Sequence, residues 1–256
     1  MRNIDGIVLA GGSPGKGEIL GATTEALLPV GGRPMVTWVL RALQDSGCIE
    51  RLVLVGPPEL STLAEEEGVY WVLAGSSAVE SALNGYRALE GSRWLLLATA
   101  DLPLLTPQAV RDFLERCLKV EADLYYPIIT RQSVEEKFGG ARRTYVRLKE
   151  GTFTGGNLAL MRADALMPCA LQGEKLVKLR KSPLGLARQI GLLFILKFIL
   201  GRLTLAEVER NFSHLLGVRG VAIITPYPEI GMDVDKREDW ELVRRVFDSA
   251  TFLGGG

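Results

Sequence analysis

The sequence predicts an α/β fold in which helices cover both faces of a doubly wound, mostly parallel mixed sheet. Three observations predict it. The first is that short apolar runs rich in Val, Leu and Ile recur along the chain, and the second is that segments with helical periodicity separate them. This alternation of strand and helix is typical of parallel sheets. The third observation is size, because 256 residues with 47% hydrophobic content can bury a full core.

Five apolar runs are predicted to be strands. They lack an alternating polar pattern, so we expect them to be largely buried. In chain order they lie at residues 6–11, 51–56, 69–75, 93–100 and 220–226. Ligands of such sheets bind beyond the carboxyl ends of the strands. The loops after Leu9, Leu73 and Ala98 should therefore converge on one site.

Two helices with clear end signals lie between these strands. In the helix at residues 33–47, Pro34 stands in the first turn and Gly47 is a C-terminal stop. In the helix at residues 106–120, Thr106 is the expected N-cap, followed by a proline. Both segments carry their apolar residues on one face, as helices that cover a sheet do.

We expect residues 1–256 to form a single domain with a helical insertion at residues 173–216, which lacks any strand signal. The stretch 175–202 holds seven basic residues and no acidic one. Within it, GLLFILKFILG (191–201) is apolar except for Lys197 and is well short of the ~20 residues of a transmembrane helix. One interpretation is a buried helix at the subunit contact of a homodimer. The other is an interfacial helix over 188–203 that contacts a membrane or a lipid-linked acceptor.

Composition argues against several classes of function. The 30 Lys and Arg balance the 30 Asp and Glu, so we expect no nucleic-acid partner. Three scattered cysteines form no CxxC, which argues against a disulfide framework or a zinc site. The single histidine, His214, argues against a serine–histidine triad. The chain enters a strand at once without a signal-peptide pattern, which predicts a cytoplasmic protein.

A glycine-rich loop follows the first strand, in IVLAGGSPGKG (Ile7–Gly17). Such loops often hold phosphate, but this one matches neither common motif. Gly15–Lys16 is followed by Gly17 where a Walker A loop needs Ser or Thr, and no three glycines have the GxGxxG spacing.

Other stretches follow this loop in a definite order. LAGG (9–12) is followed by ALLPVGGRPM (26–35), VLAGSSAVESALNGYRAL (72–89), LLLATADLPLLT (95–106) and IGMDVDKREDWELV (230–243). Together they resemble the MobA-like nucleotidyltransferases, which include the molybdenum cofactor and methylerythritol phosphate cytidylyltransferases and sugar-phosphate nucleotidyltransferases. The resemblance covers most of the chain outside 173–216. It implies a nucleotide-diphospho-sugar transferase fold, which is glycosyltransferase A-like.

The resemblance also implies an activity. Members of the MobA-like family move an NMP from a nucleoside triphosphate to a phosphorylated or hydroxylated small-molecule acceptor and release pyrophosphate. We therefore expect a nucleoside triphosphate and an anionic small molecule as partners and Mg²⁺ as cofactor. Catalysis of this reaction must neutralise charge and align the attack, which a divalent cation and basic groups do.

Three aspartates are the candidate metal ligands, because Mg²⁺ prefers carboxylate oxygens. Asp101 directly follows a buried strand, and Asp233 and Asp235 point the same way in an extended segment. By the family pattern Asp101 and Asp235 are the expected metal ligands, and Asp233 is the second choice. The alternative roles are a turn or capping residue for Asp101 and a helix N-cap for Asp235.

The loop of residues 10–17 and two further segments should hold the nucleotide. Lys16 stands in the place of the family's arginine on the triphosphate; a solvated loop lysine is the alternative. For Ser76, the alternative is the N-cap of the helix through Leu89. Backbone contacts to phosphates and base are expected from Leu9, Ala10, Gly11, Gly12, Ala74, Gly75, Ser76 and Thr99.

One position departs from the family pattern, because Glu25 stands where the family has lysine. A carboxylate repels the β- and γ-phosphates unless a cation lies between them. Lys16 or Arg33 could supply the missing charge, or Glu25 could hold a second metal or an acceptor group. The third explanation is a site that binds nucleotide without the ordinary chemistry.

The acceptor side is predicted from GTFTGGNLALM (151–161), which resembles a strand that meets the acceptor in sugar-phosphate members. Gly155, Gly156 and Asn157 are its candidate contacts; a turn with structural glycines is the alternative. The preceding arginines, Arg142, Arg143 and Arg147, would either protect a sheet edge or clamp an acceptor phosphate. Two other functions stay open: a glycosyltransferase that uses Asp233-Val-Asp235 as a DxD motif, and a non-catalytic nucleotide-binding module.

Overall fold

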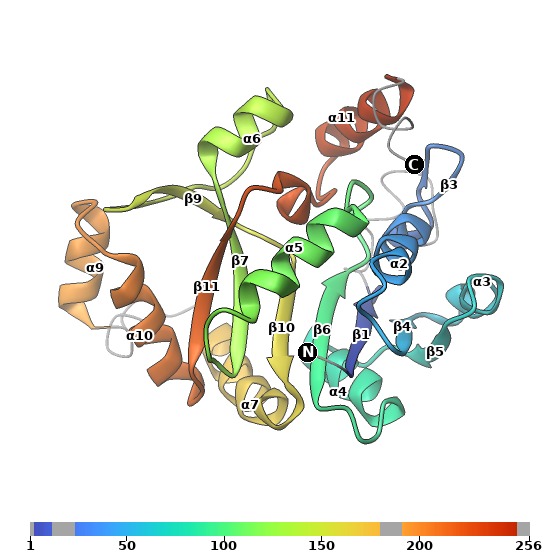
Figure 1. The fold of residues 1–256 in the computed structure, drawn as a ribbon, viewed down its shortest axis with the longest axis horizontal. Helices are drawn as coiled ribbons and strands as arrows, with labels where there is room; N and C mark the ends of the chain where they lie inside the picture. Colours follow the sequence, from blue (N-terminus) through green and yellow to red (C-terminus); the bar gives the residue numbers. More distant parts are fainter. Residues whose placement is uncertain (1–2, 12–23, 180–190, 250–256) are drawn as a thin grey trace.

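A computed structural model describes residues 3–11, 24–179 and 191–249 of the chain (Figure 1). Within them, one sheet holds nine strands: β1 (Ile4–Leu9), β4 (Leu52–Gly56), β5 (Tyr70–Leu73), β6 (Trp94–Thr99), β7 (Leu124–Thr130), β8 (Val146–Leu148), β9 (Gly151–Gly155), β10 (Leu158–Arg162) and β11 (Gly220–Thr225). The spatial order is β5–β4–β1–β6–β10–β7–β9–β8, and β11 also pairs with β7. A separate short ribbon joins β2 (Pro29–Val30) to β3 (Arg33–Pro34).

The sheet is mixed and mostly parallel in its first half. Strands β5, β4, β1 and β6 run parallel, and so do β7 and β11. Strand β10 lies antiparallel between β6 and β7, and β9 and β8 continue the antiparallel part. This confirms the predicted fold class, since helices cover both faces of a doubly wound sheet.

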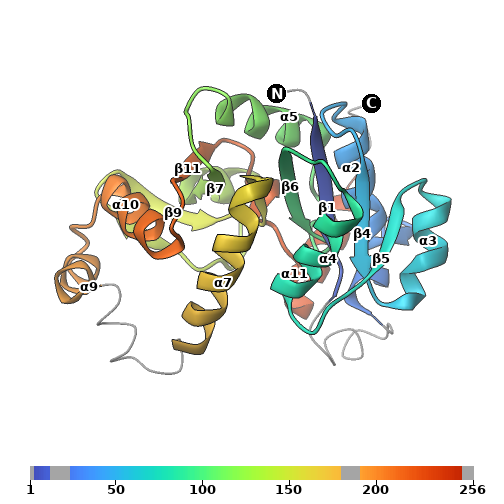
Figure 2. The same cartoon turned by 90° about the horizontal axis from the view of Figure 1, so that it is seen from below.

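The described helices are α2 (Met35–Asp45), α3 (Ser61–Glu66), α4 (Ala78–Ala88), α5 (Pro107–Cys117), α6 (Arg131–Lys137), α7 (Ala163–Leu179), α9 (Leu192–Ile199), α10 (Leu205–Leu216) and α11 (Arg237–Asp248), with short 3₁₀ turns η1 (Glu25–Leu27), η2 (Pro58–Leu60) and η3 (Pro228–Gly231). Successive strand residues point to opposite faces. Val8 of β1 packs with α2 and α5, whereas Ile7 packs with α4 and α7. Figure 2 shows these two helical layers on either side of the sheet.

All five predicted strands are present, but two are less buried than expected. Strand β5 is the sheet edge, and Tyr70 is 64% exposed there. Strand β11 pairs on one side with β7, and its Ile224 is also exposed. An unbroken apolar run does not distinguish a central strand from an edge strand, because both occur in sheets with covered faces.

The predicted helix ends are largely confirmed. The Thr106 hydroxyl accepts a hydrogen bond from the backbone N–H of Ala109, which makes it the N-cap of α5. Gly47 follows α2 with a φ of 66°, in the left-handed region that favours glycine. Pro34 is the N-cap residue of α2 rather than a residue of its first turn.

Strands β9 and β10 form one bent path along β7. Gly155 pairs with Ile128, and Leu160 pairs with Tyr125 further along the same strand. Gly156 and Asn157 interrupt the path, and the backbone N–H of Thr99 donates to the carbonyl of Asn157 over 3.3 Å. The bend therefore lies directly beside the carboxyl end of β6.

The described part of the predicted insertion consists of helices joined by short non-helical segments. Helix α7 extends to Leu179, and α9 and α10 follow before β11. Its residues 180–190 lie outside the described part. Among the described residues, no helix combines the length and apolar character needed to cross a membrane.

A buried ion pair ties β1 to the start of β4. Asp5 is 2% exposed, and its carboxylate accepts from the Arg51 guanidinium over 2.6 Å and from the Ser92 hydroxyl. Burial raises the pKa of Asp5, but the hydrogen bonds from Arg51 and Ser92 outweigh it and hold the pKa below its ordinary value.

Ser92→Ala should therefore lower the free energy of unfolding by about 2 kcal/mol at neutral pH, because a hydrogen bond to a buried carboxylate is lost. A depressed folded pKa contributes stability above the unfolded pKa of Asp5, and this stability disappears as the pH falls through the folded value. Urea unfolding at neutral and acid pH should show the difference shrink in acid. Ser249→Ala, at an exposed serine after α11, is the control. A difference that does not change with pH would contradict the assignment.

Candidate nucleotide and metal site

A cavity of about 300 Å³ opens at the carboxyl ends of β1, β5 and β6. Eight residues predicted from the sequence line it: Leu9, Ala10, Gly11, Glu25, Gly75, Ser76, Thr99 and Asp101. The loops after β1, β5 and β6 thus converge, as the fold class requires. Ala74 does not line the cavity and packs instead against the core beside α4. Gly12 and Lys16 lie outside the described residues.

The loop after β5 is held by the first turn of α4. The Ser77 hydroxyl accepts from the backbone N–H of Glu80 over 3.1 Å, so Ser77 is the N-cap and the alternative role of Ser76 is wrong. The Glu80 carboxylate accepts from both the backbone N–H and the hydroxyl of Ser76. These hydrogen bonds lower the pKa of Glu80. The Ser77-x-x-Glu80 spacing is a capping-box pattern and could have been found in the sequence.

Two further observations define this loop. The backbone N–H of Gly75 donates to the hydroxyl of Ser81 over 3.0 Å, and Ser81 is buried and lines the cavity. A Cβ on Gly75 would lie 2.4 Å from Cγ of Glu80. Any larger residue at position 75 would clash with the Glu80 side chain. Glycine is therefore needed here even without a ligand close to it.

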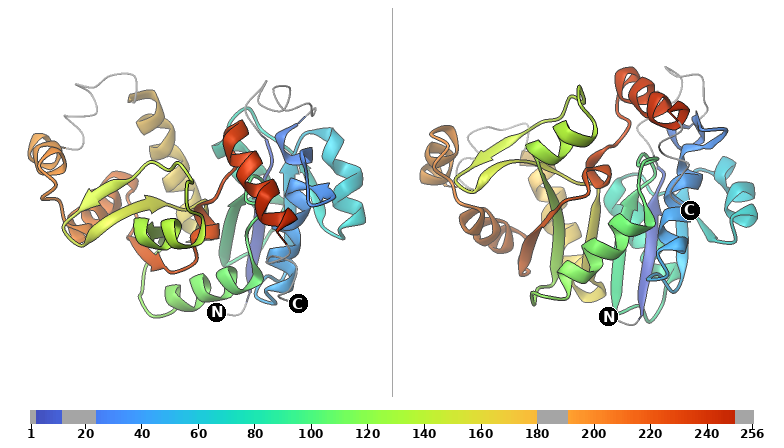
Figure 3. Two further views of the ribbon diagram at one scale, coloured as in Figure 1. Left: turned by 90° about the horizontal axis from the view of Figure 1, so that it is seen from above. Right: turned by 45° about the horizontal axis from the view of Figure 1, so that its top comes forward.

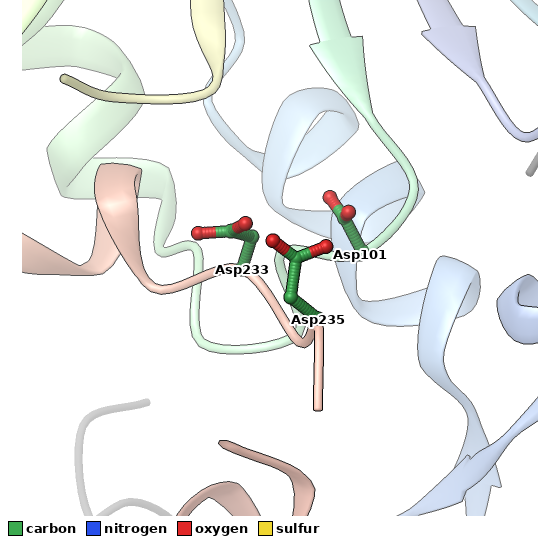
Figure 4. Close-up of side chains that lie close together, drawn as sticks. All are labelled: Asp101, Asp233 and Asp235. Carbon is green, nitrogen blue, oxygen red and sulfur yellow. The ribbon is translucent and has the colours of Figure 1, made fainter. Parts of the chain in front are cut away.

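Three carboxylates meet at one edge of this cavity. One oxygen from each of Asp101, Asp233 and Asp235 lies within 4.8 Å of the others. Figure 4 shows Asp101 at the end of β6 and the other two side chains on the segment before α11, all directed toward one another. We call these three residues the acidic cluster.

Backbone contacts explain why the acidic cluster forms. The N–H of Val234 donates to the carbonyl of Asp101 over 3.0 Å, which joins two segments far apart in sequence. Val234 is fully buried, so the flanking aspartates point to the opposite side. The N-cap of α11 is Lys236, so the alternative role of Asp235 is wrong. The Asp239 carboxylate accepts from the N–H groups of Asp235 and Lys236 instead.

The acidic cluster concentrates negative charge. Burial raises the pKa of Asp101 to about 6; the hydrogen bond from Thr99 opposes this, and repulsion by Asp233 and Asp235 adds to it. Burial and Asp235 also raise the pKa of Asp233, against the attraction of Arg143.

Arg143 contacts the acidic cluster through Asp233. Its guanidinium lies 2.6 Å from Oδ1 of Asp233 and 3.5 Å from Asp239, and it donates to the backbone carbonyl of Asp233 over 2.7 Å. Its side chain is only 8% exposed. Arg143 therefore does not protect an exposed sheet edge, and sequence reasoning missed its pairing with Asp233.

Glu25 is buried and lines the same cavity from the short turn η1. Arg33 is exposed on β3, with its guanidinium 5.9 Å from the ring centre of Trp38. The position of Glu25 puts a carboxylate where the sequence analysis places triphosphate. Lys16, which could supply a compensating charge, lies outside the described residues.

Of the three acceptor candidates, Gly155 lines a second cavity beside Asp233 and Asp235, whereas Gly156 and Asn157 do not line it. This cavity of about 330 Å³ is lined by Thr154, Gly155, Asp233, Asp235, Arg142 and Lys236, among others. Gly156 is explained by packing, because a Cβ there would lie 2.7 Å from Ile230. A Cβ on Gly155 would lie 2.5 Å from the Tyr126 hydroxyl. The structural alternative for these glycines is thus supported, and no comparable constraint applies to Asn157.

The donor set of the acidic cluster fits a hard divalent cation. It offers three carboxylates close together; burial and then repulsion by Asp233 and Asp235 raise the pKa of Asp101. Oxygen ligands of this kind suit Mg²⁺.

Comparisons with known proteins agree with this geometry. A solved structure described as a hypothetical transferase from Thermus thermophilus is 42% identical, covers 94% of this chain and 100% of its own, and has a TM-score of 0.80. A nucleotidyl transferase from Methanothermobacter is 18% identical, covers 98% and 100%, and has a TM-score of 0.62, which shows a shared fold.

One curated relative matches part of the chain. The 2-C-methyl-D-erythritol 4-phosphate cytidylyltransferase of Frankia casuarinae is 34% identical over 101 residues, which are 38% of this chain and 38% of that protein. The family model of the MobA-like NTP transferase domain matches residues 6–175, which include the first strand, the loop after β5 and Asp101. The resemblance predicted from the sequence is thereby confirmed, and the chain belongs to the MobA-like NTP transferase family.

Proposed function

We propose that the protein is a Mg²⁺-dependent nucleotidyltransferase that joins an NMP to a phosphorylated or hydroxylated small-molecule acceptor. An acceptor oxygen forms a bond to the α-phosphorus, the bond from that phosphorus to the bridging oxygen breaks, and pyrophosphate leaves. A hydroxyl acceptor also gives up its proton, whereas a phosphate acceptor at neutral pH needs to lose none. The observation that carries the proposal is the acidic cluster between two cavities.

The donor nucleotide is assigned to the first cavity. Backbone N–H groups of the loop after Ala10 would bind the phosphates, with Lys16 as the cationic partner of the triphosphate; the N–H of Ala10 itself donates to the carbonyl of Val55. The base lies against Gly75 and Ser76, whose backbone positions are set by Ser81 and Glu80. Preorganised donors of this kind stabilise developing negative charge without rearrangement.

The acceptor is assigned to the second cavity. Arg142 and Lys236 are exposed there, which favours an anionic acceptor group, and the Thr154 side chain adds a hydroxyl. Asn157 lies at the bend beside β6, where its amide would orient an acceptor hydroxyl. The acidic cluster separates the two cavities, so the reacting groups would meet beside it.

The acidic cluster would hold Mg²⁺ through Asp101, Asp235 and Asp233. When bound, the cation neutralises phosphate charge and helps to orient the triphosphate. Arg143 keeps the Asp233 carboxylate in place beside the other two. Glu25 and Lys16 are the remaining candidates for groups that touch the reacting phosphates.

Calorimetric titration with CTP, GTP, UTP and ATP, each with and without Mg²⁺, tests this proposal. We expect one nucleotide to bind tightly only when Mg²⁺ is present. CTP is the first to be tested because the Frankia relative is named for cytidylyl transfer. Ser81→Ala should weaken binding about tenfold, because Gly75 loses its hydrogen-bond acceptor. Ser249→Ala is a matched control remote from the cavity.

Two outcomes would favour the alternatives. Tight binding of a nucleoside diphosphate sugar, but of no triphosphate, would indicate a glycosyltransferase. Equal binding with and without Mg²⁺, together with no pyrophosphate release after Glu25→Lys, would indicate a non-catalytic nucleotide-binding module. The buried position of Glu25 in the cavity is the observation that keeps this second candidate open.

A further inference from the structure

Helix α9 exposes a cluster of large apolar side chains at one end of the molecule. Leu193, Leu196 and Leu200 follow one another at helical spacing and are 65%, 52% and 57% exposed, and Ile199 beside them is 72% exposed. Phe198 is exposed as well. Figures 1 and 3 show α9 as the outermost element, next to α10. Contiguous apolar patches of this kind mark interaction sites more often than isolated exposed residues do.

The opposite side of α9 attaches it to the protein. Phe194 packs against the small core cluster of Leu148, Phe153 and Leu203. The Lys197 ammonium bonds to the carboxylate of Glu207 on α10. The exposed residues are therefore held outward on an anchored helix.

Basic side chains surround this apolar cluster. Arg202 follows α9, Arg147 lies beside Gly201, and Lys149 hydrogen-bonds through its backbone to Leu203. All three side chains are exposed, and Arg210 on α10 lines a groove shared with Leu193. We call these four cations and the five exposed apolar residues of α9 the α9 surface.

The acidic groups next to the α9 surface are already engaged. Glu207 binds Lys197 and caps α10 at Thr204, and these bonds lower its pKa to about 2. Glu150 accepts from the backbone N–H of Leu205 over 3.0 Å. The α9 surface therefore combines apolar groups with excess positive charge in a chain whose formal net charge is zero.

We propose that the α9 surface binds an anionic lipid surface, with α9 lying in the plane of the membrane. The apolar side chains would enter the boundary between headgroups and acyl chains, and the cations would stay at the level of the headgroups. A short helix with exposed aliphatic residues on one side and basic residues nearby suits this arrangement. The inference does not depend on the proposed function.

A second copy of the chain is the other obvious occupant, and charge argues against it. In a two-fold contact the same patch faces itself. The basic residues Arg147, Lys149 and Arg202 of both copies would then gather at one contact, and like charges close together are unfavourable. An anionic membrane instead offers negative charge to every one of these side chains.

Co-sedimentation of the full-length protein with vesicles tests the proposal. Vesicles of phosphatidylcholine mixed with phosphatidylglycerol should bind the protein, and pure phosphatidylcholine vesicles should bind it far less. Leu196→Glu with Ile199→Glu should weaken binding at least about tenfold, because two inserted side chains become charged. Tyr70→Glu with Leu118→Glu, at two exposed apolar residues elsewhere, is the matched control and should bind like the wild type.

The contribution of charge is tested separately. Arg147→Gln with Arg202→Gln should weaken binding to the anionic vesicles about 30-fold, since each basic side chain near the surface contributes about fivefold. Added salt should weaken binding in the same direction.

Three outcomes would overturn the proposal. One is a wild-type protein that fails to sediment with anionic vesicles, and another is equal binding to both kinds of vesicle. The third is a dimer in light scattering that Leu196→Glu with Ile199→Glu converts to monomers, which would assign the α9 surface to a second copy. Thermal unfolding of the variants shows that the substitutions, all at exposed positions, leave the fold intact. Nucleotide binding is measured in a separate titration. A failure of vesicle binding therefore leaves the proposed nucleotidyltransferase function untouched, and a failure of nucleotide binding leaves the membrane proposal untouched.

Discussion

Asp101→Asn should lower the rate of Mg²⁺-dependent nucleotidyl transfer by about three orders of magnitude, because weaker metal binding removes roughly 4 kcal/mol of transition-state stabilisation. The position of Asp101 explains why we expect the largest effect there. It lies at the carboxyl end of β6, lines the nucleotide cavity and reaches both other carboxylates of the acidic cluster. Asparagine keeps the size of the side chain but removes its charge. Pyrophosphate release, measured with the nucleotide found by calorimetry, is the readout.

A matched substitution separates this effect from general damage. Asp45→Asn changes an exposed aspartate at the end of α2 and should leave turnover within about twofold, as most exposed substitutions do. The Asp101 variant should also need more Mg²⁺ for half-maximal binding of nucleotide. Unchanged turnover and unchanged Mg²⁺ dependence would together show that Asp101 is not a metal ligand.

Much of this site could be predicted from the sequence because its parts follow strands. Parallel strands end at the same edge of a sheet, so residues at the carboxyl ends of strands or just beyond them meet there. Leu9, Gly75, Thr99 and Asp101 all satisfy this condition, and all of them line one cavity. Asp233 and Asp235 could be predicted as a pair because alternating residues of an extended segment face one side.

The contacts that hold the site together could not be predicted in the same way. Arg143 looks like one member of a basic surface run, and its pairing with Asp233 depends on the close approach of two loops 90 residues apart. The Val234–Asp101 backbone bond has no side-chain signature either. Spacing reveals which residues share a face of one element, but not which loop packs on another.

The burial of edge strands could not be predicted from the sequence either. The runs that became β4 and β5 are similarly apolar, yet the residues of β4 are buried and Tyr70 of β5 is not. The difference arises from strand order in the sheet, which is set by crossover connections rather than by local composition. The apolar run of α9 is a comparable case. Its composition allowed a helix buried at a subunit contact or an interfacial helix, and the exposed side chains of α9 in the single chain agree with both.

The second large effect concerns the balance of charge around the acidic cluster. Arg143→Met should lower the free energy of unfolding by about 3 kcal/mol, because removing one partner of a buried ion pair leaves the other charge uncompensated. The pair is buried enough for this cost, with the Asp233 side chain 17% exposed and that of Arg143 8%. In a protein of this size the melting temperature should fall by roughly 6–12 °C. Arg162→Met, which breaks a half-exposed pair with Asp164, should cost less than about 1 kcal/mol.

Mg²⁺ connects this stability effect to the proposed function. Without Arg143, Asp233 and Asp239 lose the cation between them, and the acidic cluster becomes more negative. A divalent cation that binds the folded protein should then stabilise the variant more than the wild type, since ligand binding adds to the free energy of unfolding. Melting curves of both proteins with and without Mg²⁺ should therefore show the gap between them narrow when the ion is present. If the gap stays the same, the three carboxylates do not hold a cation, and Arg143 is a structural partner of Asp233 alone.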